Sequence, residues 1–350
     1  MAVVDGRPTA FYTGVNGSTD ADRREAVCRA RALDDDLVAW EVDPEPLLPV
    51  AAGFSRDPFV WQDDEGWHLL LGAAGSVQHA RSPDGLRWEP TGAFYDDADT
   101  SHPVGGRHWE CPQLLRLPEA DVLLLSVQDG THDAPVLRVV AVVGRARDGR
   151  FTGGAPAPLE AGDCLYAPAV CQEPGGRWLL WAWLRETLPD DRLADLGRVG
   201  ALSLPLACSL EAGRLVLRPV PELAALRGPR RPPGPVDGPV EATVLLGDGG
   251  AVVLRLGPDE QVVVRRAGGS LVVDRSAASR AGWGGADPLV VAVPGGPRAV
   301  RLLRDGSVLV VLVDGAVAAV SRVYPLAAAG GAVLVEGDAT DVEVWGLAAR

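Results

Sequence analysis

Three short motifs that end in proline recur along the first half of the chain. The motifs are Ser55-Arg56-Asp57-Pro58, Trp109-Glu110-Cys111-Pro112 and Leu165-Tyr166-Ala167-Pro168. Their prolines are 54 and 56 residues apart, and each is followed by an apolar run, a polar turn and a second apolar run. A repeat of this length is typical of the blades of a β-propeller. The sequence therefore predicts consecutive blades, each of which begins near one of these motifs.

The first residues of the chain resemble the later part of one repeat. Residues 3–8 indicate a turn, and residues 10–13 indicate the second strand of a blade. One repeat length before Pro58 falls near Val4, so the innermost strand of this blade would precede Met1. We therefore expect the chain to begin in the middle of a blade and to be truncated at its N-terminus.

The composition favours an all-β fold and argues against several functions. Glycine (42) and proline (29) are plentiful among the 350 residues, and short Val, Leu and Trp runs end at turn residues. The net charge of −14 argues against nucleic acid or an anionic membrane as a partner. No apolar run approaches the length of a membrane span. Lysine is absent, which excludes Schiff-base chemistry and a lysine-containing phosphate-binding loop.

The cysteines and the first residues bear on the cellular compartment. The five cysteines are odd in number and form no Cys-x-x-Cys pair, so they predict neither a disulfide framework nor a zinc site. Residues 1–8 have neither the basic start nor the apolar core of a signal peptide. A reduced, cytoplasmic setting is therefore expected, whereas the oligomeric state is not specified by the sequence.

A stretch rich in proline, glycine and arginine divides the chain. Residues 227–239 can form neither a helix nor a central strand, so they predict a linker between a propeller domain (1–226) and a second domain (240–350). In the second domain, short apolar strands alternate with Gly and Asp turns, a spacing typical of a β-sandwich. The strands predicted there are 241–246, 251–256, 261–265, 270–274, 299–303, 307–313, 316–323 and 342–347.

Asp57 and Glu110 occupy nearly equivalent positions in adjacent repeats. The innermost strands of a propeller line its central channel, so side chains at the starts of the repeats converge there. Two carboxylates in such a funnel suit glycoside hydrolysis, in which one protonates the leaving oxygen and the other attacks or stabilises the sugar cation. The competing interpretation is structural, with Asp57 capping a turn and Glu110 pairing with an arginine. Their equivalent placement next to Arg56 and Trp109 favours the catalytic interpretation.

In this order and spacing, the motifs closely resemble glycoside hydrolase family 32, the β-fructofuranosidases, which include invertases, sucrose-6-phosphate hydrolases, levanases and inulinases. Further agreeing segments span nearly all of the chain, among them 10–15, 200–205, 218–223 and 272–276. The resemblance implies a five-bladed β-propeller, here with the first blade missing and the second incomplete, followed by a C-terminal β-sandwich. It also implies a retaining displacement on a terminal β-fructofuranosyl unit of sucrose or a β-fructan, with no cofactor and no metal.

The resemblance assigns roles to individual residues. Glu110 would be the general acid/base and Asp57 the transition-state stabiliser, with Arg56 beside it and Trp109 in the wall of the pocket. Tyr166 would be either a structural residue or a pocket-wall residue. None of the five histidines has metal-ligand spacing. His108 is a further candidate for the pocket because it adjoins Trp109 and Glu110, whereas the other four are assigned to turns or the core.

The family nucleophile is an aspartate in an Asn-Asp-Pro-Asn type motif, which the 350 residues do not contain. Three functions therefore stay open. The first is a β-fructofuranosidase whose nucleophile is absent from this chain. The second is a catalytically inactive fructoside-binding or vestigial family member, and the third is a protein-interaction propeller, which the intact acidic motifs disfavour. The nearest rival enzyme is a related five-bladed arabinan or xylan hydrolase.

Overall fold

The computed structural model describes residues 1–17, 24–49, 55–98, 101–131, 134–188, 190–197, 199–279, 283, 287–326 and 331–348. The chain divides into two compact units. The first contains residues 1–159, 167–170 and 210–215, and the second contains residues 160–166, 171–209 and 216–350. Most of the described residues are in β-strands and very few are in helices, as the composition predicted. Two short 3-10 helices, η1 (Asp190–Leu196) and η2 (Pro221–Leu226), interrupt the strands.

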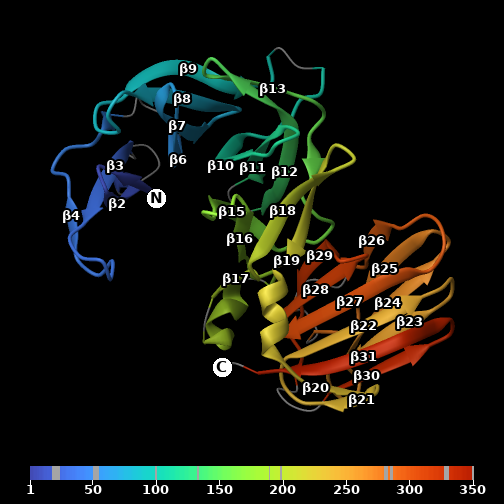
Figure 1. Cartoon of the computed structure of the whole chain (residues 1–350). Coiled ribbons are helices and arrows are strands. Elements are labelled where there is room, and N and C mark those ends of the chain that lie inside the picture. Colours follow the sequence, from blue (N-terminus) through green and yellow to red (C-terminus); the bar gives the residue numbers. More distant parts are fainter. Residues whose placement is uncertain are drawn as a thin grey trace. The chain divides into compact units, whose positions relative to one another are not determined.

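Three antiparallel sheets follow one another along residues 1–159 (Figure 1). The first has the order β1-β2-β3-β4 with β5 paired to β3, the second β6-β7-β8-β9, and the third β10-β11-β12-β13 with β14 paired to β12. Their strands are β1 (Ala2–Val4), β2 (Arg7–Asn16), β3 (Arg24–Ala32), β4 (Trp40–Val42), β5 (Leu48–Pro49), β6 (Ser55–Asp63), β7 (Gly66–Ala73), β8 (Ser76–Ser82), β9 (Glu89–Asp96), β10 (His108–Arg116), β11 (Asp121–Thr131), β12 (Ala134–Arg147), β13 (Arg150–Gly153) and β14 (Ala157–Pro158).

A fourth sheet repeats the same meander with the order β15-β16-β18-β19, and β17 pairs with β16. Its strands are β15 (Leu165–Gln172), β16 (Trp178–Leu184), β17 (Ala201–Leu202), β18 (Leu206–Glu211) and β19 (Arg214–Pro219). Each of the three proline motifs lies on the first strand of its sheet, namely β6, β10 and β15. The repeat that the sequence predicted is therefore a structural repeat.

The residue before each motif proline has a left-handed backbone. The φ angle is 61° at Asp57, 47° at Cys111 and 48° at Ala167. The pairing register shifts at the first two of these residues, between β6 and β7 and between β10 and β11. A residue other than glycine is uncommon in this region of φ and ψ, and a following proline disfavours α-type conformations further. The repeat therefore preserves a bulge, a feature that bends a strand and changes the direction of its side chains.

The second sheet is covered on both of its faces. Leu69 and Leu71 of β7 belong to an apolar cluster shared with the first sheet, where the rings of Phe11 and Trp88 meet edge to face at 5.9 Å. Leu70, the residue between them, belongs to a cluster shared with the third sheet. Successive side chains of a strand point to opposite faces, so this continuous apolar run fills two cores.

His68 and His79 lie in the core, as the sequence predicted. They are 3% and 2% exposed. His68 Nδ1 lies 3.0 Å from His79 Nε2, and His68 Nε2 lies 2.9 Å from a carboxylate oxygen of Asp63. Both ring nitrogens of His68 and Nε2 of His79 therefore have hydrogen-bonding partners, as buried polar atoms require. His132 lies outside the described residues.

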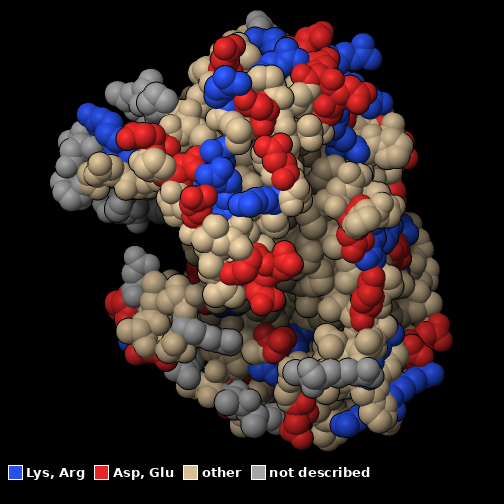
Figure 2. Space-filling model, turned by 60° about the vertical axis from the view of Figure 1, so that its left-hand side comes forward, with Lys and Arg blue, Asp and Glu red and all other residues tan. Residues whose placement is uncertain are grey.

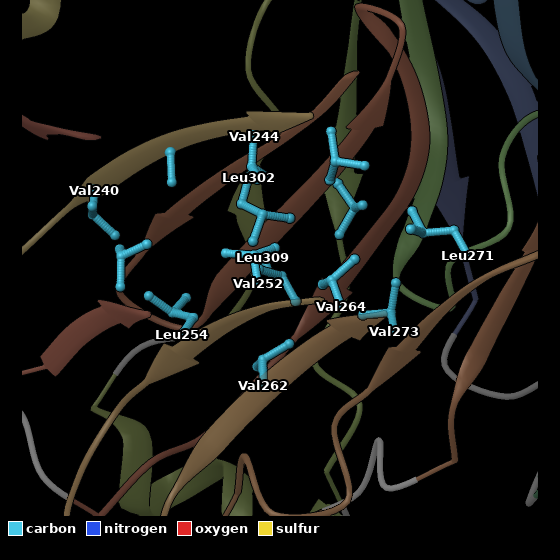
Figure 3. Packing of buried hydrophobic residues seen from close by; sticks show 14 of the residues in the cluster. Val240, Val244, Val252, Leu254, Val262, Val264, Leu271, Val273, Leu302 and Leu309 are labelled. Atoms are coloured by element: carbon cyan, nitrogen blue, oxygen red, sulfur yellow. The ribbon is translucent and has the colours of Figure 1, made fainter. Parts of the chain in front are cut away.

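The C-terminal part of the second unit is a two-sheet sandwich, as predicted. One sheet has the order β20-β31-β22-β27-β28-β29 and the other β21-β30-β23-β24-β25-β26. Figure 3 shows Val244, Leu302 and Leu309 of the first sheet facing Val252 and Val264 of the second. The strands are β20 (Arg227–Arg231), β21 (Gly234–Val236), β22 (Val240–Leu246), β23 (Ala251–Arg255), β24 (Gln261–Ala267), β25 (Ser270–Asp274), β26 (Leu289–Ala292), β27 (Arg298–Asp305), β28 (Val308–Val313), β29 (Ala316–Arg322), β30 (Gly331–Glu336) and β31 (Ala339–Leu347).

The residues predicted as a linker, 227–239, contain two of these strands. β20 pairs with β31 and β21 pairs with β30, and each is the outermost strand in the order of its sheet. Proline is tolerated on edge strands, because the N–H group it lacks is not needed on the open side. The stretch contains no central strand, as predicted. It is not a linker throughout, however, because it includes two edge strands.

The surface and the cysteines add two observations. On the face shown in Figure 2, Arg side chains lie among Asp and Glu side chains. All five cysteines lie in the described part of the chain, and they are free thiols. No helix among the described residues has the length and apolar character needed to cross a membrane.

Candidate active site

The first two proline motifs contact one another in the first unit. Arg56 and Asp57 lie at the start of β6, and Glu110 and Cys111 lie at the start of β10. Arg56 Nη1 is 3.4 Å from Glu110 Oε1, and Asp57 Oδ2 accepts a hydrogen bond from the Cys111 backbone N–H at 3.1 Å. Two carboxylates and a guanidinium, from motifs 54 residues apart, are thus brought together as the sequence predicted.

The bulge in each motif is held by a side chain from a strand of the preceding sheet. The N–H of Asp57 donates to Thr13 Oγ1 at 2.8 Å, and the N–H of Ala167 donates to Ser126 Oγ at 3.1 Å. The Asp57 carboxylate accepts the Cys111 N–H in the same way, and it also accepts a hydrogen bond from Cys111 Sγ at 3.5 Å. Asp57 Oδ2 therefore caps the turn, as the structural interpretation of Asp57 predicted. Oδ1 is then the oxygen through which this carboxylate could hold a ligand.

Arg56 is held by a residue that the sequence reasoning missed. Glu25 on β3 is 3% exposed and accepts hydrogen bonds from the Ser55 N–H at 3.1 Å and from Arg56 Nε at 3.4 Å. Its second oxygen, Oε1, forms an ion pair with Arg56 Nη2. A buried carboxylate is stable only when it is paired and hydrogen-bonded, and Arg56 provides the pairing here.

A signal for Glu25 existed in the alternation of β3. Glu25, Val27 and Arg29 occupy alternate positions and are all buried. Two charged residues on the inner face of an otherwise apolar strand indicate that each needs a partner of opposite charge. The partner of Arg29 is Asp43, with Nε 2.8 Å from Oδ2, whereas Glu25 pairs with a residue of the next sheet.

The close approach of β10 to β7 depends on a glycine. Gly72 pairs with Arg56 across β6 and β7. A Cβ atom at position 72 would lie 2.1 Å from the carbonyl oxygen of Trp109 and 3.0 Å from Glu110 Cα. No side chain fits in that space, so Gly72 allows the backbone that carries Glu110 to pack against β7.

Trp109 lies in the core and not at an open surface. Its side chain is fully buried, its Nε1 donates to the Gly105 carbonyl oxygen at 2.8 Å, and its ring packs against Tyr95 with centroids 5.8 Å apart. A fully buried indole cannot stack on a sugar from this position, so the pocket-wall role expected for Trp109 is corrected to a packing role.

His108 and Cys111 flank Glu110 along β10 and differ in chemistry. His108 is half-buried, and burial together with the positive charges of Arg107 and Arg56 lowers its pKa below the ordinary histidine value. Burial and the Asp57 carboxylate raise the pKa of the Cys111 thiol well above its usual range. Both side chains are therefore neutral near pH 7, and Cys111 is not a thiolate nucleophile.

Tyr166 belongs to the second unit. It is 5% exposed, and the guanidinium of Arg185 lies 5.9 Å from its ring centroid. A buried tyrosine beside an arginine favours the structural one of its two predicted roles. Within the described residues there is no group of three or more His, Cys, Asp or Glu side chains that could hold a metal ion.

A model of a known protein family matches most of the chain. It is described as the N-terminal domain of glycosyl hydrolases family 32, and it matches residues 1–219 of the 350. The chain belongs to family 32. Sucrose-6-phosphate hydrolase from Bacillus subtilis is 29% identical over 249 residues, which are 64% of this chain and 50% of that protein. The Klebsiella pneumoniae protein of the same name is 30% identical over 243 residues, covering 64% and 51%.

Solved structures of family 32 share the fold. Sucrose-6-phosphate hydrolase from Lactobacillus gasseri has a TM-score of 0.83 at 20% identity, over 98% of this chain and 76% of that one. A Bombyx mori β-fructofuranosidase has a TM-score of 0.80 at 23% identity, over 97% and 76%. Such family 32 neighbours have a β-propeller and a β-sandwich. The chain spans about half the length of the curated relatives it matches.

Proposed function

We propose that this chain carries the acid and the stabilising carboxylate of a β-fructofuranosidase, which hydrolyses terminal β-D-fructofuranosyl residues of sucrose or a fructan. The proposed architecture is a five-bladed propeller, of which residues 1–226 contain neither the first blade nor all of the second, followed by a sandwich within 240–350. The observation that carries the proposal is the joining of the two acidic motifs, Arg56 to Glu110 at 3.4 Å and Asp57 to the Cys111 N–H at 3.1 Å. Membership of family 32 supports it.

Glu110 is the proposed general acid/base. Its side chain is 14% exposed, and Arg56 Nη1 contacts its Oε1 at 3.4 Å. In the first step of a retaining mechanism the acid gives its proton to the leaving glycosidic oxygen, and in the second step it takes a proton from water. Asp57 would hold fructosyl hydroxyls through Oδ1, and the guanidinium of Arg56 would contribute a donor beside it.

The covalent step needs a third carboxylate. A retaining enzyme attacks the anomeric carbon from the face opposite the acid, and the family aspartate for this step lies in a motif that the 350 residues do not contain. This observation favours the second candidate function, in which Arg56, Asp57 and Glu110 bind a fructoside and no bond is broken. The two candidates share one binding site and differ in turnover.

Glu110→Gln separates the two candidates. Fructose release from sucrose, sucrose 6-phosphate and inulin is measured for the chain and the variant, and sugar binding is measured by calorimetry. Glu65→Gln is the matched control, since Glu65 is exposed and pairs with Arg81. Hydrolysis predicts a loss of at least about 100-fold in Glu110→Gln with binding retained. Binding without release in both proteins selects the second function, and equal release by both overturns the assignment of Glu110.

A further inference from the structure

We propose that Glu25 is a positioning residue that keeps Glu110 protonated by sharing the guanidinium of Arg56. The inference rests on the proposed function, because it concerns the proton that Glu110 would donate. Three charged side chains from three sheets form one chain of contacts: Glu25 on β3, Arg56 on β6 and Glu110 on β10. Glu25 contacts Arg56 through Nε and Nη2, and Glu110 contacts it through Nη1.

The two glutamates differ in their exposure. The side chain of Glu25 is 2% exposed, that of Glu110 is 14% exposed, and that of Arg56 is 23% exposed. Glu25 is therefore closed off from a ligand, whereas Glu110 is the more exposed of the two carboxylates. Glu25 also accepts the N–H of Ser55, which directly precedes Arg56, so it fixes both the strand and the side chain.

An arginine next to a general acid works against that acid. A positive charge within about 4–6 Å favours the carboxylate form and lowers the pKa of the acid, whereas an acid catalyst must hold its proton near the working pH. Glu25 counters this effect in two ways. It pairs with the same guanidinium, and it adds a negative charge on the far side of that guanidinium.

Among the residues that the structure describes, the other titratable groups around Glu110 differ from Glu25 in charge or in their contacts. His108 and Cys111 on β10 are neutral near pH 7 for the reasons given above. Asp57 on β6 is a second negative charge, and its Oδ2 accepts the Cys111 N–H. Arg107, which precedes β10, adds a second positive charge to the group. Within the described part of the chain, Glu25 is thus a carboxylate that contacts Arg56 directly, through atoms other than the one that contacts Glu110.

The test measures the titration of Glu110 in the full chain, independently of turnover. Glutamate side chains are labelled with carbon-13, the Glu110 carboxyl signal is assigned by its loss in Glu110→Gln, and its midpoint is followed with pH. In Glu25→Gln the amide oxygen still accepts the Ser55 N–H, but the charge is gone. The midpoint of Glu110 should fall by about one pH unit, and it should stay unchanged in the control Glu65→Gln. An unchanged midpoint in folded Glu25→Gln overturns the proposal.

Arg56→Gln tests the same link from the other side. Removal of the guanidinium should raise the Glu110 midpoint, and in that background Glu25→Gln should shift the midpoint by less than half as much as in the parent chain. If Glu25→Gln shifts the Glu110 midpoint equally in both backgrounds, Glu25 does not act through Arg56. An unchanged Glu110 midpoint in Arg56→Gln also contradicts the proposal, and this variant is the test if Glu25→Gln does not fold. Where the chain releases fructose, the alkaline limb of its pH profile should move down with the midpoint. Failure of the proposed function gives a different result: the Glu110 midpoint still shifts in Glu25→Gln, but the chain releases no fructose.

Discussion

The candidate site and the sandwich core are built in opposite ways. The sandwich core consists of alternating Val and Leu side chains from two sheets, such as Val252 and Leu309 (Figure 3). The candidate site joins strands from three sheets through charged and polar groups, including the buried Glu25. Apolar burial is non-directional, so the core depends on volume and area, whereas the site depends on which atom meets which. Substitutions in the core should therefore change stability, and substitutions in the site should change ligand binding more than stability.

The largest loss of stability is expected from Leu309→Ala in the sandwich. Leu309 is fully buried, so the truncation removes apolar contacts and leaves a cavity. The free energy of unfolding should fall by about 2–5 kcal/mol. Urea denaturation checks this, with Val290→Ala as the control because Val290 is 60% exposed. Fructoside affinity per folded molecule should be unchanged, and a parallel loss of affinity would contradict the separation of core and site.

Gly72→Ala should affect both properties. The added methyl group meets the Trp109 carbonyl oxygen at 2.1 Å, so the backbone of β10 must shift. We expect a loss of about 2–3 kcal/mol in unfolding free energy and a tenfold or larger loss of fructoside affinity. Gly346→Ala is the matched control, because a Cβ at this strand position meets nothing within 4 Å. Unchanged affinity in Gly72→Ala would show that the position of β10 is not critical for the site.

Glu160→Gln tests a charged group outside the candidate site. Burial raises the pKa of Glu160 to about 7, although its carboxylate accepts the N–H groups of Val320 and Gly162. Because the folded pKa lies above the unfolded value, the folded state binds more protons between about pH 4.5 and 7. The contribution is complete below pH 4.5 and is lost as the pH rises towards 7.

The expected size of this loss is up to about 3 kcal/mol. It is measured as the difference between the chain and Glu160→Gln in unfolding free energy at several pH values, which cancels the titration of the other groups. A difference that stays constant from pH 4.5 to 7.5 would rule out the raised pKa.

The smallest change in stability is expected from Asp57→Asn. The amide oxygen can still accept the Cys111 N–H, so the unfolding free energy should change by less than about 1 kcal/mol. Fructoside affinity should nevertheless fall at least tenfold, because the charge proposed to hold the sugar is lost. Calorimetric titration with fructose measures it, and retained affinity would assign Asp57 to bulge capping alone.

The sandwich was predictable because its signal is local. The alternation of apolar residues predicted strands at 251–256, 261–265 and 270–274, and β23, β24 and β25 lie there. β26 and β30 were not predicted. They are short, and β30 begins at Gly331, in a glycine- and alanine-rich stretch that reads as a turn.

The candidate site was only partly predictable because its contacts are long-range. The repeated motifs indicated Arg56, Asp57 and Glu110, since a repeat places equivalent residues on equivalent strands. Glu25 lies outside the motifs, and its contact with Arg56 depends on how two sheets pack. The packing role of Trp109 was missed because Trp109 was interpreted together with its neighbour Glu110 as part of one motif. Side chains alternate along β10, so the two residues point to opposite faces of the strand.

The most direct test of the account is a crystal structure of Glu110→Gln soaked with sucrose, since the substitution prevents proton donation and leaves the binding groups in place. The account predicts a fructosyl unit with a hydroxyl within hydrogen-bond distance of Asp57 Oδ1 and with its glycosidic oxygen facing residue 110. Sucrose bound elsewhere, or a fructosyl unit that contacts neither Asp57 nor residue 110, would contradict the claim that the two acidic motifs form one fructoside site.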